Sequence, residues 1–197
     1  MHLLLSDSVV GLFVQVLPVS LLAGLIFSAV RLQKQKKQRR SVSRGRELLL
    51  FLFVCYVTGL ANLVLVPANF WSGFWYSVCT GVPVWDLPAL FSGDFNLLPT
   101  FVRYLTSELT GMPGRWILTM LVGNFLMFVP LGVFLPLVFP RLQGRKMAAA
   151  ILLIPLAVEL WQPIVGRSFD TDDLICNTLG LLLGWAVVQL FLGKSRR

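Results

Sequence analysis

Charged residues are scarce in this 197-residue chain, at 13% of the sequence, whereas soluble domains carry about 25%. Hydrophobic residues make up 56%. So low a charge content excludes an ordinary soluble domain and indicates a protein that crosses a membrane several times. The chain also lacks a visible internal repeat, which gives little support to a transporter built from inverted repeats.

Cysteine is rare as well, because Cys55, Cys79 and Cys176 are the three in the chain, and their spacing fits no metal-binding motif. An odd, scattered set argues against a disulfide framework, while a Cys79–Cys176 bridge stays open if both residues face an oxidising compartment. A basic region is missing ahead of the first apolar run, over residues 1–8, so the sequence predicts no cleavable signal peptide.

Apolar runs long enough to span a bilayer, which takes roughly 20 residues, dominate the rest of the chain. The candidate spans are at about 9–30, 47–68, 116–139, 147–165 and 173–192. They predict an all-α polytopic membrane protein, a bundle of about five transmembrane helices. Within it we distinguish an N-terminal helix and basic loop over 1–46, and a membrane domain over 47–197 with an outer aromatic-rich segment at 69–115.

The 17 basic residues are distributed unevenly between the loops, since fourteen of them lie in residues 31–46, 141–146 and 194–197. Cytoplasmic loops carry an excess of Lys and Arg, so we predict that the N-terminus is outside and the C-terminus is cytoplasmic. Orientation therefore explains the net charge of +8, and no nucleic-acid partner is expected. Residues 31–46 are expected to form a solvated loop that touches anionic lipid headgroups.

The outer segment at 69–115 is too polar to span a membrane and is broken by Pro and Gly. Its many aromatic side chains suit the membrane–water interface. Thr100 is placed to cap a short helix in which Phe101 and Leu105 share one face. We predict that this helix lies flat on the outer surface, and simple packing over the helix bundle is compatible with that position.

Polar side chains interrupt the apolar spans, where an ionisable group is costly unless it is paired or functional. They are Asn62, Asn124, Glu159, Gln162 and Asn177. At a rise of 1.5 Å per residue, each lies in the outward half of its span, and together they predict a shallow polar pocket that opens outside. For Asn62, a hydrogen bond to a neighbouring helix is the simpler interpretation.

The densest polar pattern begins near the end of the fourth span. Glu159 shares a helix face with Gln162, and Arg167 is close enough in sequence to reach back to it. A carboxyl group within lipid must be neutral or paired, which favours a functional role for Glu159. Asp170 is open to two interpretations, a site residue or the N-cap of the last span, with Asp173 completing the cap.

One stripe runs down the last span, formed by Asp173, Asn177, Gly180 and Gly184 at spacings of four, three and four. The two glycines form a small-residue face that allows another helix to approach closely. The upper half of the stripe is polar and would offer a site. We expect Asp172, which is off this stripe, to face solvent.

Four short motifs carry a resemblance. They are Asn96-Leu97-Leu98-Pro99; Asn124-x-x-x-Phe128-x-Pro130-Leu131-Gly132; Glu159-x-x-Gln162; and Arg167-x-x-Asp170-x-Asp172-Asp173-x-x-x-Asn177-x-x-Gly180. In this order, over residues 90–192, the sequence resembles the VanZ-like family of bacterial membrane proteins. That family is associated with resistance to the glycopeptide teicoplanin. The resemblance implies a multi-pass protein of the bacterial cytoplasmic membrane with a role in the cell envelope, and it supplies no reaction.

The first functional hypothesis is an intramembrane enzyme that acts on a lipid-linked or cell-surface glycan in the outer leaflet. Its acid, base or nucleophile would come from Glu159, Asp170 and Asp173. Arg167 would bind a phosphate or carboxylate group. The other substrate-binding candidates are Asn96, Asn124, Gln162 and Asn177.

The second hypothesis is a protein without chemistry that binds an envelope lipid or precursor and limits access of the antibiotic. A divalent ion in the acidic cluster would fit either hypothesis, although the spacing is not that of an EF-hand. A channel or transporter ranks third, because five spans and one shallow pocket do not make a pathway. Membrane lipids are the expected partners, and the sequence names no cofactor.

Overall fold

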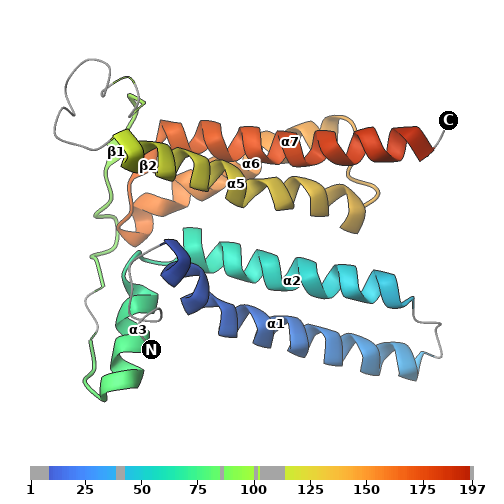
Figure 1. Cartoon of the computed structure of the whole chain (residues 1–197), viewed down its shortest axis with the longest axis horizontal. Helices are drawn as coiled ribbons and strands as arrows, with labels where there is room; N and C mark the ends of the chain where they lie inside the picture. The colour runs from blue at the N-terminus through green and yellow to red at the C-terminus, as the bar shows by residue number, and fades with distance from the viewer. Residues whose placement is uncertain (1–8, 39–42, 85–86, 100–101, 103–113, 196–197) are drawn as a thin grey trace. The chain divides into compact units, whose positions relative to one another are not determined.

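The computed structural model describes residues 9–38, 43–84, 87–99, 102 and 114–195. Its long elements are helices, and they fall into two compact units, residues 1–88 and 89–197 (Figure 1). Among these residues, five helices are long and apolar enough to cross a membrane, which confirms the predicted number of candidate spans and the all-α class. The predicted orientation of the termini and the division after residue 46 stay predictions.

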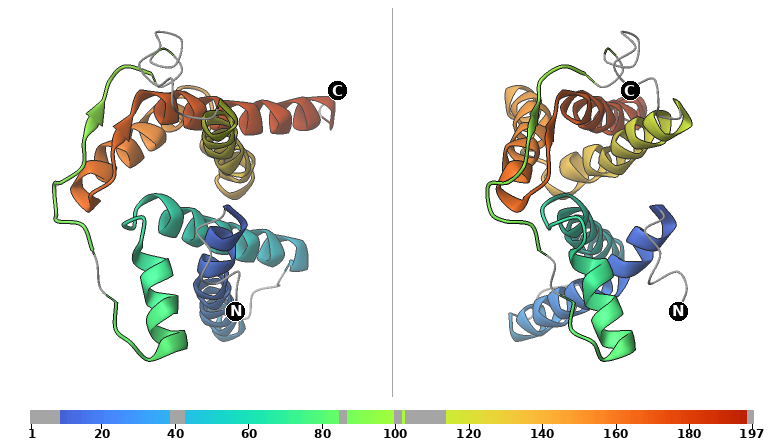
Figure 2. Two further views of the ribbon diagram at one scale, coloured as in Figure 1. Left: turned by 60° about the vertical axis from the view of Figure 1, so that its left-hand side comes forward. Right: turned by 90° about the vertical axis from the view of Figure 1, so that its left-hand side faces the viewer.

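The first unit contains α1 (Val9–Lys37), α2 (Arg44–Val64) and α3 (Phe70–Thr80). α1 and α2 pack side by side as a hairpin, and α3 lies crosswise at one end of it, in contact with α1 (Figure 2). Trp75 fixes α3 to α1, because its indole Nε1 donates a hydrogen bond to the carbonyl oxygen of Gln15 at 2.9 Å. α3 was not predicted, although it begins within the aromatic-rich segment and ends at Gly81, which adopts the left-handed conformation common after helices.

The ends of several helices differ from the predicted spans for local reasons. α1 continues through Lys37, because Lys and Gln favour helix and basic side chains suit a helix C-terminus. α2 ends at Val64, since Pro67 follows shortly and cannot continue a helix. The short helix predicted after Thr100 falls outside the described residues except for Val102, which is helical.

Two details of the predicted spans also change. Asn62 donates a hydrogen bond to the carbonyl oxygen of Thr58 at 2.8 Å, one turn earlier in α2, so this bond lies within its own helix and does not reach a neighbouring one as predicted. An Asn side chain reaches the carbonyl four residues back without a second helix. The three cysteines are free thiols.

The second unit contains β1 (Phe95–Asn96), α5 (Gly114–Val138), α6 (Arg145–Trp161), the 3₁₀ helix η2 (Gln162–Val165), β2 (Phe169–Asp170) and α7 (Thr171–Ser195). α7 packs against both α5 and α6. β1 and β2 form a parallel pair of two residues each, an addition that no apolar run predicts.

Small residues set the approach of α5 to α7, which confirms the predicted glycine face. A Cβ atom added to Gly180 would overlap the carbonyl oxygen of Phe125, and one added to Gly184 would overlap that of Val129. Gly132 of α5 lies equally close to the carbonyl oxygen of Leu181. The two helix backbones are therefore in contact along this face.

We expect Gly180→Leu and Gly184→Leu to lower the folded yield and the melting temperature, because the new side chain would clash with the backbone of α5. Overpacking of a core costs about 1–3 kcal/mol when neighbouring side chains are able to adjust. Here the atoms that block the space belong to the backbone of α5. Gly123→Leu on α5 is the matched control, since a Cβ at Gly123 has nothing within 4 Å. Equal melting temperatures for all three variants in detergent would contradict the close packing.

Candidate functional site

The polar residues of the second unit meet where α6 ends and α7 begins. α6 gives way to η2, which has Pro163 at its start and ends at Gly166 in the left-handed conformation. The backbone N–H of Arg167 then donates to the carbonyl oxygen of Gln162 at 3.0 Å. This reversal brings the chain back past the end of α6 before α7 starts.

A second segment, residues 91–97, runs along this reversal. The β1–β2 register pairs Phe95 with Phe169 and Asn96 with Asp170, and the rings of Phe95 and Phe169 stack at 5.7 Å. Gly93 lies so close to Arg167 that an added Cβ would overlap the Arg167 carbonyl oxygen. A residue with a side chain would push the two segments apart, so glycine is required at this point.

Glu159 is the centre of the cluster, and its side chain is fully buried with an exposed fraction of 0%. Its Oε1 accepts a hydrogen bond from Nδ2 of Asn177 at 3.1 Å. Its Oε2 accepts a longer one from the backbone N–H of Asp170 at 3.4 Å. A buried carboxyl group is stable only when its oxygens are satisfied, and these two donors come from α7 and β2.

Asn124 joins α5 to the same cluster, because its side-chain amide donates a hydrogen bond to Oδ1 of Asp173 on α7. Asn177 lies one turn further along α7 and is 3% exposed. Its Oδ1 is buried and has no hydrogen-bond partner among the described residues. The cluster therefore holds one unused acceptor beside Glu159, and buried acceptors are normally satisfied by protein, water or ligand.

Arg167 supplies the positive charge of the cluster. Burial lowers the pKa of its guanidinium, and the nearby carboxyl groups of Asp173 and Glu159 oppose that shift. The side chain is therefore within electrostatic reach of both acids, as its place in the sequence suggested. A planar guanidinium among carboxyl groups can bind a phosphate or carboxylate with two parallel hydrogen bonds.

The structure thus brings together most of the residues proposed as a site. Hydrogen bonds link Glu159 with Asn177 and with the Asp170 backbone, and a separate hydrogen bond links Asn124 with Asp173. Arg167 interacts electrostatically with both Glu159 and Asp173 and so connects the two sets. The hydrogen bond from Asp170 to Glu159 is donated by the backbone N–H of Asp170. Gln162 is 5% exposed and touches the cluster through its carbonyl, and Asn96 through its backbone pairing with Asp170.

Asp172 does not face solvent, which corrects the prediction from the helix stripe, because it is 5% exposed. The reason lies in the neighbouring segment. Oγ1 of Thr171 donates to the carbonyl oxygens of Asn96 at 3.2 Å and Leu97 at 3.0 Å, so β1 lies against the first turn of α7. Helix periodicity carries no information about a loop that covers a helix end.

Two residues of this region were not singled out from the sequence as site residues. Thr171 ties β1 to α7, and Asp172 is a buried acid beside Asp173. The available signal was the motif itself, which includes Asp172 and has Thr171 between two of its residues. In the part of the chain that the structure describes, no group of three or more His, Cys, Asp or Glu side chains is placed to hold a metal ion.

Comparison with known families decides the relationship. The model of the VanZ/LLP1 family matches residues 13–192. The chain belongs to the VanZ/LLP1 family. The match confirms the resemblance drawn from the motifs. It also extends the resemblance toward the N-terminus, because the matched region includes α2 and most of α1. No curated protein and no solved structure matches the chain.

We expect Glu159→Gln to preserve the fold of this VanZ/LLP1 protein. The Gln oxygen accepts the Asp170 N–H, and the new NH₂ group is satisfied when the Asn177 amide turns over and presents Oδ1. The turn exchanges the unpaired acceptor of Asn177 for an unpaired NH₂ group at the same place, which is a smaller loss than that of both Glu159 acceptors. Glu159→Leu removes both acceptors and leaves the buried amide of Asn177 and the partly buried N–H of Asp170 without partners, at about 1–3 kcal/mol for a fully buried donor. Thermal unfolding in detergent should therefore rank wild type first, Gln a little below it and Leu lowest. A Gln variant as unstable as Leu would contradict the proposed rotation of the Asn177 amide.

Proposed function

We propose that this protein works at the bacterial cell envelope, as a multi-pass protein of the cytoplasmic membrane that binds or modifies an outer-leaflet lipid or glycan. Membership of the VanZ/LLP1 family and five helices able to span a membrane support the setting. The observation that carries the proposal is the buried polar cluster around Glu159, since such a group at membrane depth is costly and is kept where function requires it.

The chemistry of the cluster suits a ligand with both an anionic and a hydroxyl group. Arg167 offers a guanidinium for a phosphate or carboxylate. The unused Oδ1 of Asn177 accepts a hydrogen bond from a hydroxyl group. Lipid-linked sugars of the envelope carry both kinds of group, and Asn96, Asn124 and Gln162 would complete the binding set.

As an enzyme, the protein would use its acids in different roles according to their surroundings. Asp170 and Asp173 keep partial exposure and would reach the ligand. Glu159 would take part from within the cluster, through Asn177 and the Asp170 backbone. The three acids together would provide the acid, base or nucleophile of a reaction at a glycan, for which no further detail is proposed.

A binding protein without chemistry is the second candidate, and one observation favours it. Glu159 has an exposed fraction of 0% and both of its oxygens accept hydrogen bonds, which is also how a purely structural carboxyl group is held. Such a protein would shield an envelope lipid or precursor and limit access of a glycopeptide such as teicoplanin. Both candidates place the resistance phenotype at the same cluster.

The outward orientation is tested by cysteine labelling of intact cells. We expect the native Cys79, which is exposed, to react with an impermeant reagent from outside. A cysteine introduced at Gln35, beside the basic loop, should react only after the cells are opened, because Lys- and Arg-rich loops stay in the cytoplasm. The opposite labelling pattern would place the cluster on the cytoplasmic side and exclude an outer-leaflet ligand.

The function of the cluster is tested by variants that fold. We expect Glu159→Gln to insert normally and to lose the envelope or resistance phenotype, because the amide can neither transfer a proton as a carboxyl group does nor pair with Arg167. Arg167→Lys should also fail, since the planar fork is lost. Asp170→Asn is the milder change, because Asn keeps the backbone link to Glu159 and can cap α7.

Analysis of envelope lipids and glycans from cells with and without the protein then separates the two candidates. A changed covalent product identifies the enzyme, whereas altered drug binding to unchanged envelopes identifies the shield. Full function in Glu159→Gln would exclude the acid–base proposal.

A further inference from the structure

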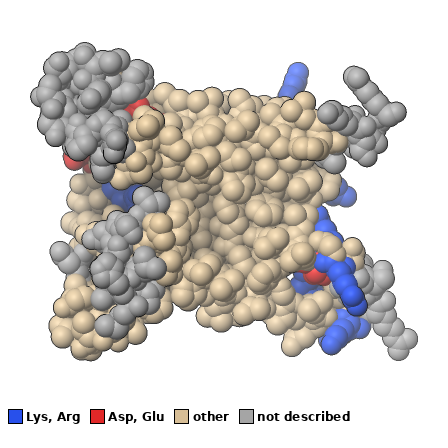
Figure 3. Space-filling model, in the orientation of Figure 1, with Lys and Arg blue, Asp and Glu red and all other residues tan. Residues whose placement is uncertain are grey.

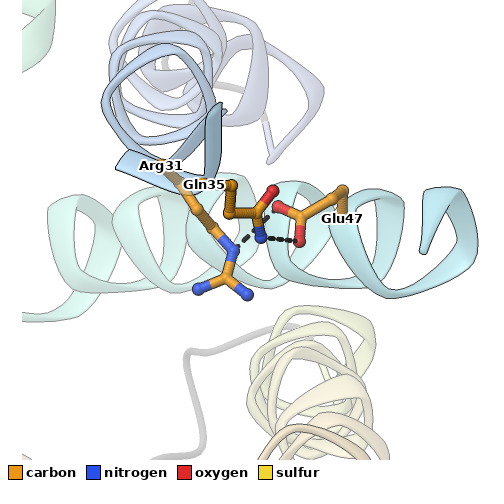
Figure 4. Close-up of polar contacts among 3 residues, drawn as sticks. All are labelled: Arg31, Gln35 and Glu47. Carbon is orange, nitrogen blue, oxygen red and sulfur yellow. Dashed lines mark hydrogen bonds and ion pairs between the residues drawn. The ribbon is translucent and has the colours of Figure 1, made fainter. Parts of the chain in front are cut away.

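A second polar cluster lies near the connection between α1 and α2, where α1 ends and α2 begins. Nε of Arg31 on α1 is bound to Oε2 of Glu47 on α2 at 2.8 Å. Nε2 of Gln35 donates to Oε1 of the same carboxyl group at 2.8 Å. Figure 4 shows the three side chains converging between the two helices. Both oxygens of Glu47 are thereby used within the hairpin.

Glu47 holds Arg31 by its inner nitrogen and leaves the rest of the guanidinium available. Figure 4 shows the two terminal nitrogens of Arg31 on the side away from Glu47. The Arg31 side chain keeps an exposed fraction of 37%, against 17% for Glu47. A guanidinium that is oriented in advance loses less freedom on binding, and its terminal N–H groups match a phosphate with two parallel hydrogen bonds.

The surroundings of Arg31 are strongly basic. The last turn of α1 contains Lys34, Lys36 and Lys37, and α2 starts with Arg44 and Arg46. Figure 3 shows Lys and Arg side chains gathered at this end of the α1–α2 hairpin, at the lower right, around a single acidic patch. Since Glu47 is the one acid that these two helices contain, the field at the Arg31 terminal nitrogens attracts anions.

Apolar surface begins directly beside the cluster. Val30 precedes Arg31 and is 60% exposed, and Leu48 follows Glu47 and is 58% exposed. One turn deeper, Ile26 is 55% and Leu52 is 46% exposed. Both helices are candidate membrane spans, so this surface faces hydrocarbon where a phosphate group would lie at its border. The match is to a molecule with an anionic head and acyl chains.

We infer that the Arg31–Gln35–Glu47 cluster is a binding site for one anionic phospholipid, such as phosphatidylglycerol. The phosphate accepts hydrogen bonds from the terminal nitrogens of Arg31, and the acyl chains lie along the exposed faces of α1 and α2. The acyl contacts make the lipid, and not free phosphate, the occupant. This site is independent of the cluster around Glu159 and of the function proposed for it.

Native mass spectrometry of the full chain, purified in detergent with equal amounts of phosphatidylglycerol and phosphatidylcholine, tests the site. We expect one phosphatidylglycerol to be retained, and Arg31→Gln to lower its retention by about tenfold or more, since the oriented fork is lost as well as the charge. Lys37→Gln is the matched control, because it removes one charge from the same exposed helix end and should cost about fivefold or less. Equal losses in the two variants would show general surface attraction and overturn the site.

Two further measurements distinguish the loss of lipid binding from misfolding and from the binding of a different ligand. Arg31→Lys keeps a cation for Glu47 and hence the hairpin, but lacks separate terminal nitrogens, so retention should still fall several-fold at an unchanged melting temperature; retention equal to wild type would overturn the proposed geometry. A large excess of inorganic phosphate should leave the lipid bound. Displacement by phosphate alone would assign the site to a free anion and reject the lipid.

Discussion

The buried carboxyl group of Glu159 joins three separate parts of the second unit. It belongs to α6, yet its hydrogen-bond donors are the Asn177 side chain of α7 and the Asp170 backbone of β2. Without it, the buried amide of Asn177 and the partly buried N–H of Asp170 would lack acceptors, and the polar link between α6 and the start of α7 would be lost. Arg167 lies in the connection between these elements, within electrostatic reach of Glu159 and Asp173.

Close packing between α5 and α7 supports this polar cluster. Gly180 and Gly184 allow α7 to touch the backbone of α5, and that contact sets the height at which Asn124 meets Asp173. Van der Waals packing of small residues is what holds helices together in lipid, where burial of apolar surface gives little. The polar cluster thus sits on a rigid pair of helices, which is what a site with fixed geometry requires.

The polar clusters around Glu159 and Glu47 use a glutamate in different ways. Glu159 is fully enclosed and satisfied by an amide and a backbone N–H, whereas Glu47 keeps some exposure and is satisfied by a cation and an amide. A carboxyl group that is enclosed can only position its neighbours or exchange protons with them. A carboxyl group at a helix end can orient a cation toward a molecule outside the protein, which is the basis of the lipid site at Arg31.

The sequence by itself determined the number of candidate spans, the glycine face of α7 and most members of the polar cluster, because each depends on residue type and short spacing. Only the tertiary structure decided what covers a helix end. The β1 segment encloses Asp172, Glu159 is bonded to the Asp170 backbone, and Glu47 selects the inner nitrogen of Arg31. These contacts join residues that are distant in sequence or involve backbone groups, and neither has a periodic signal.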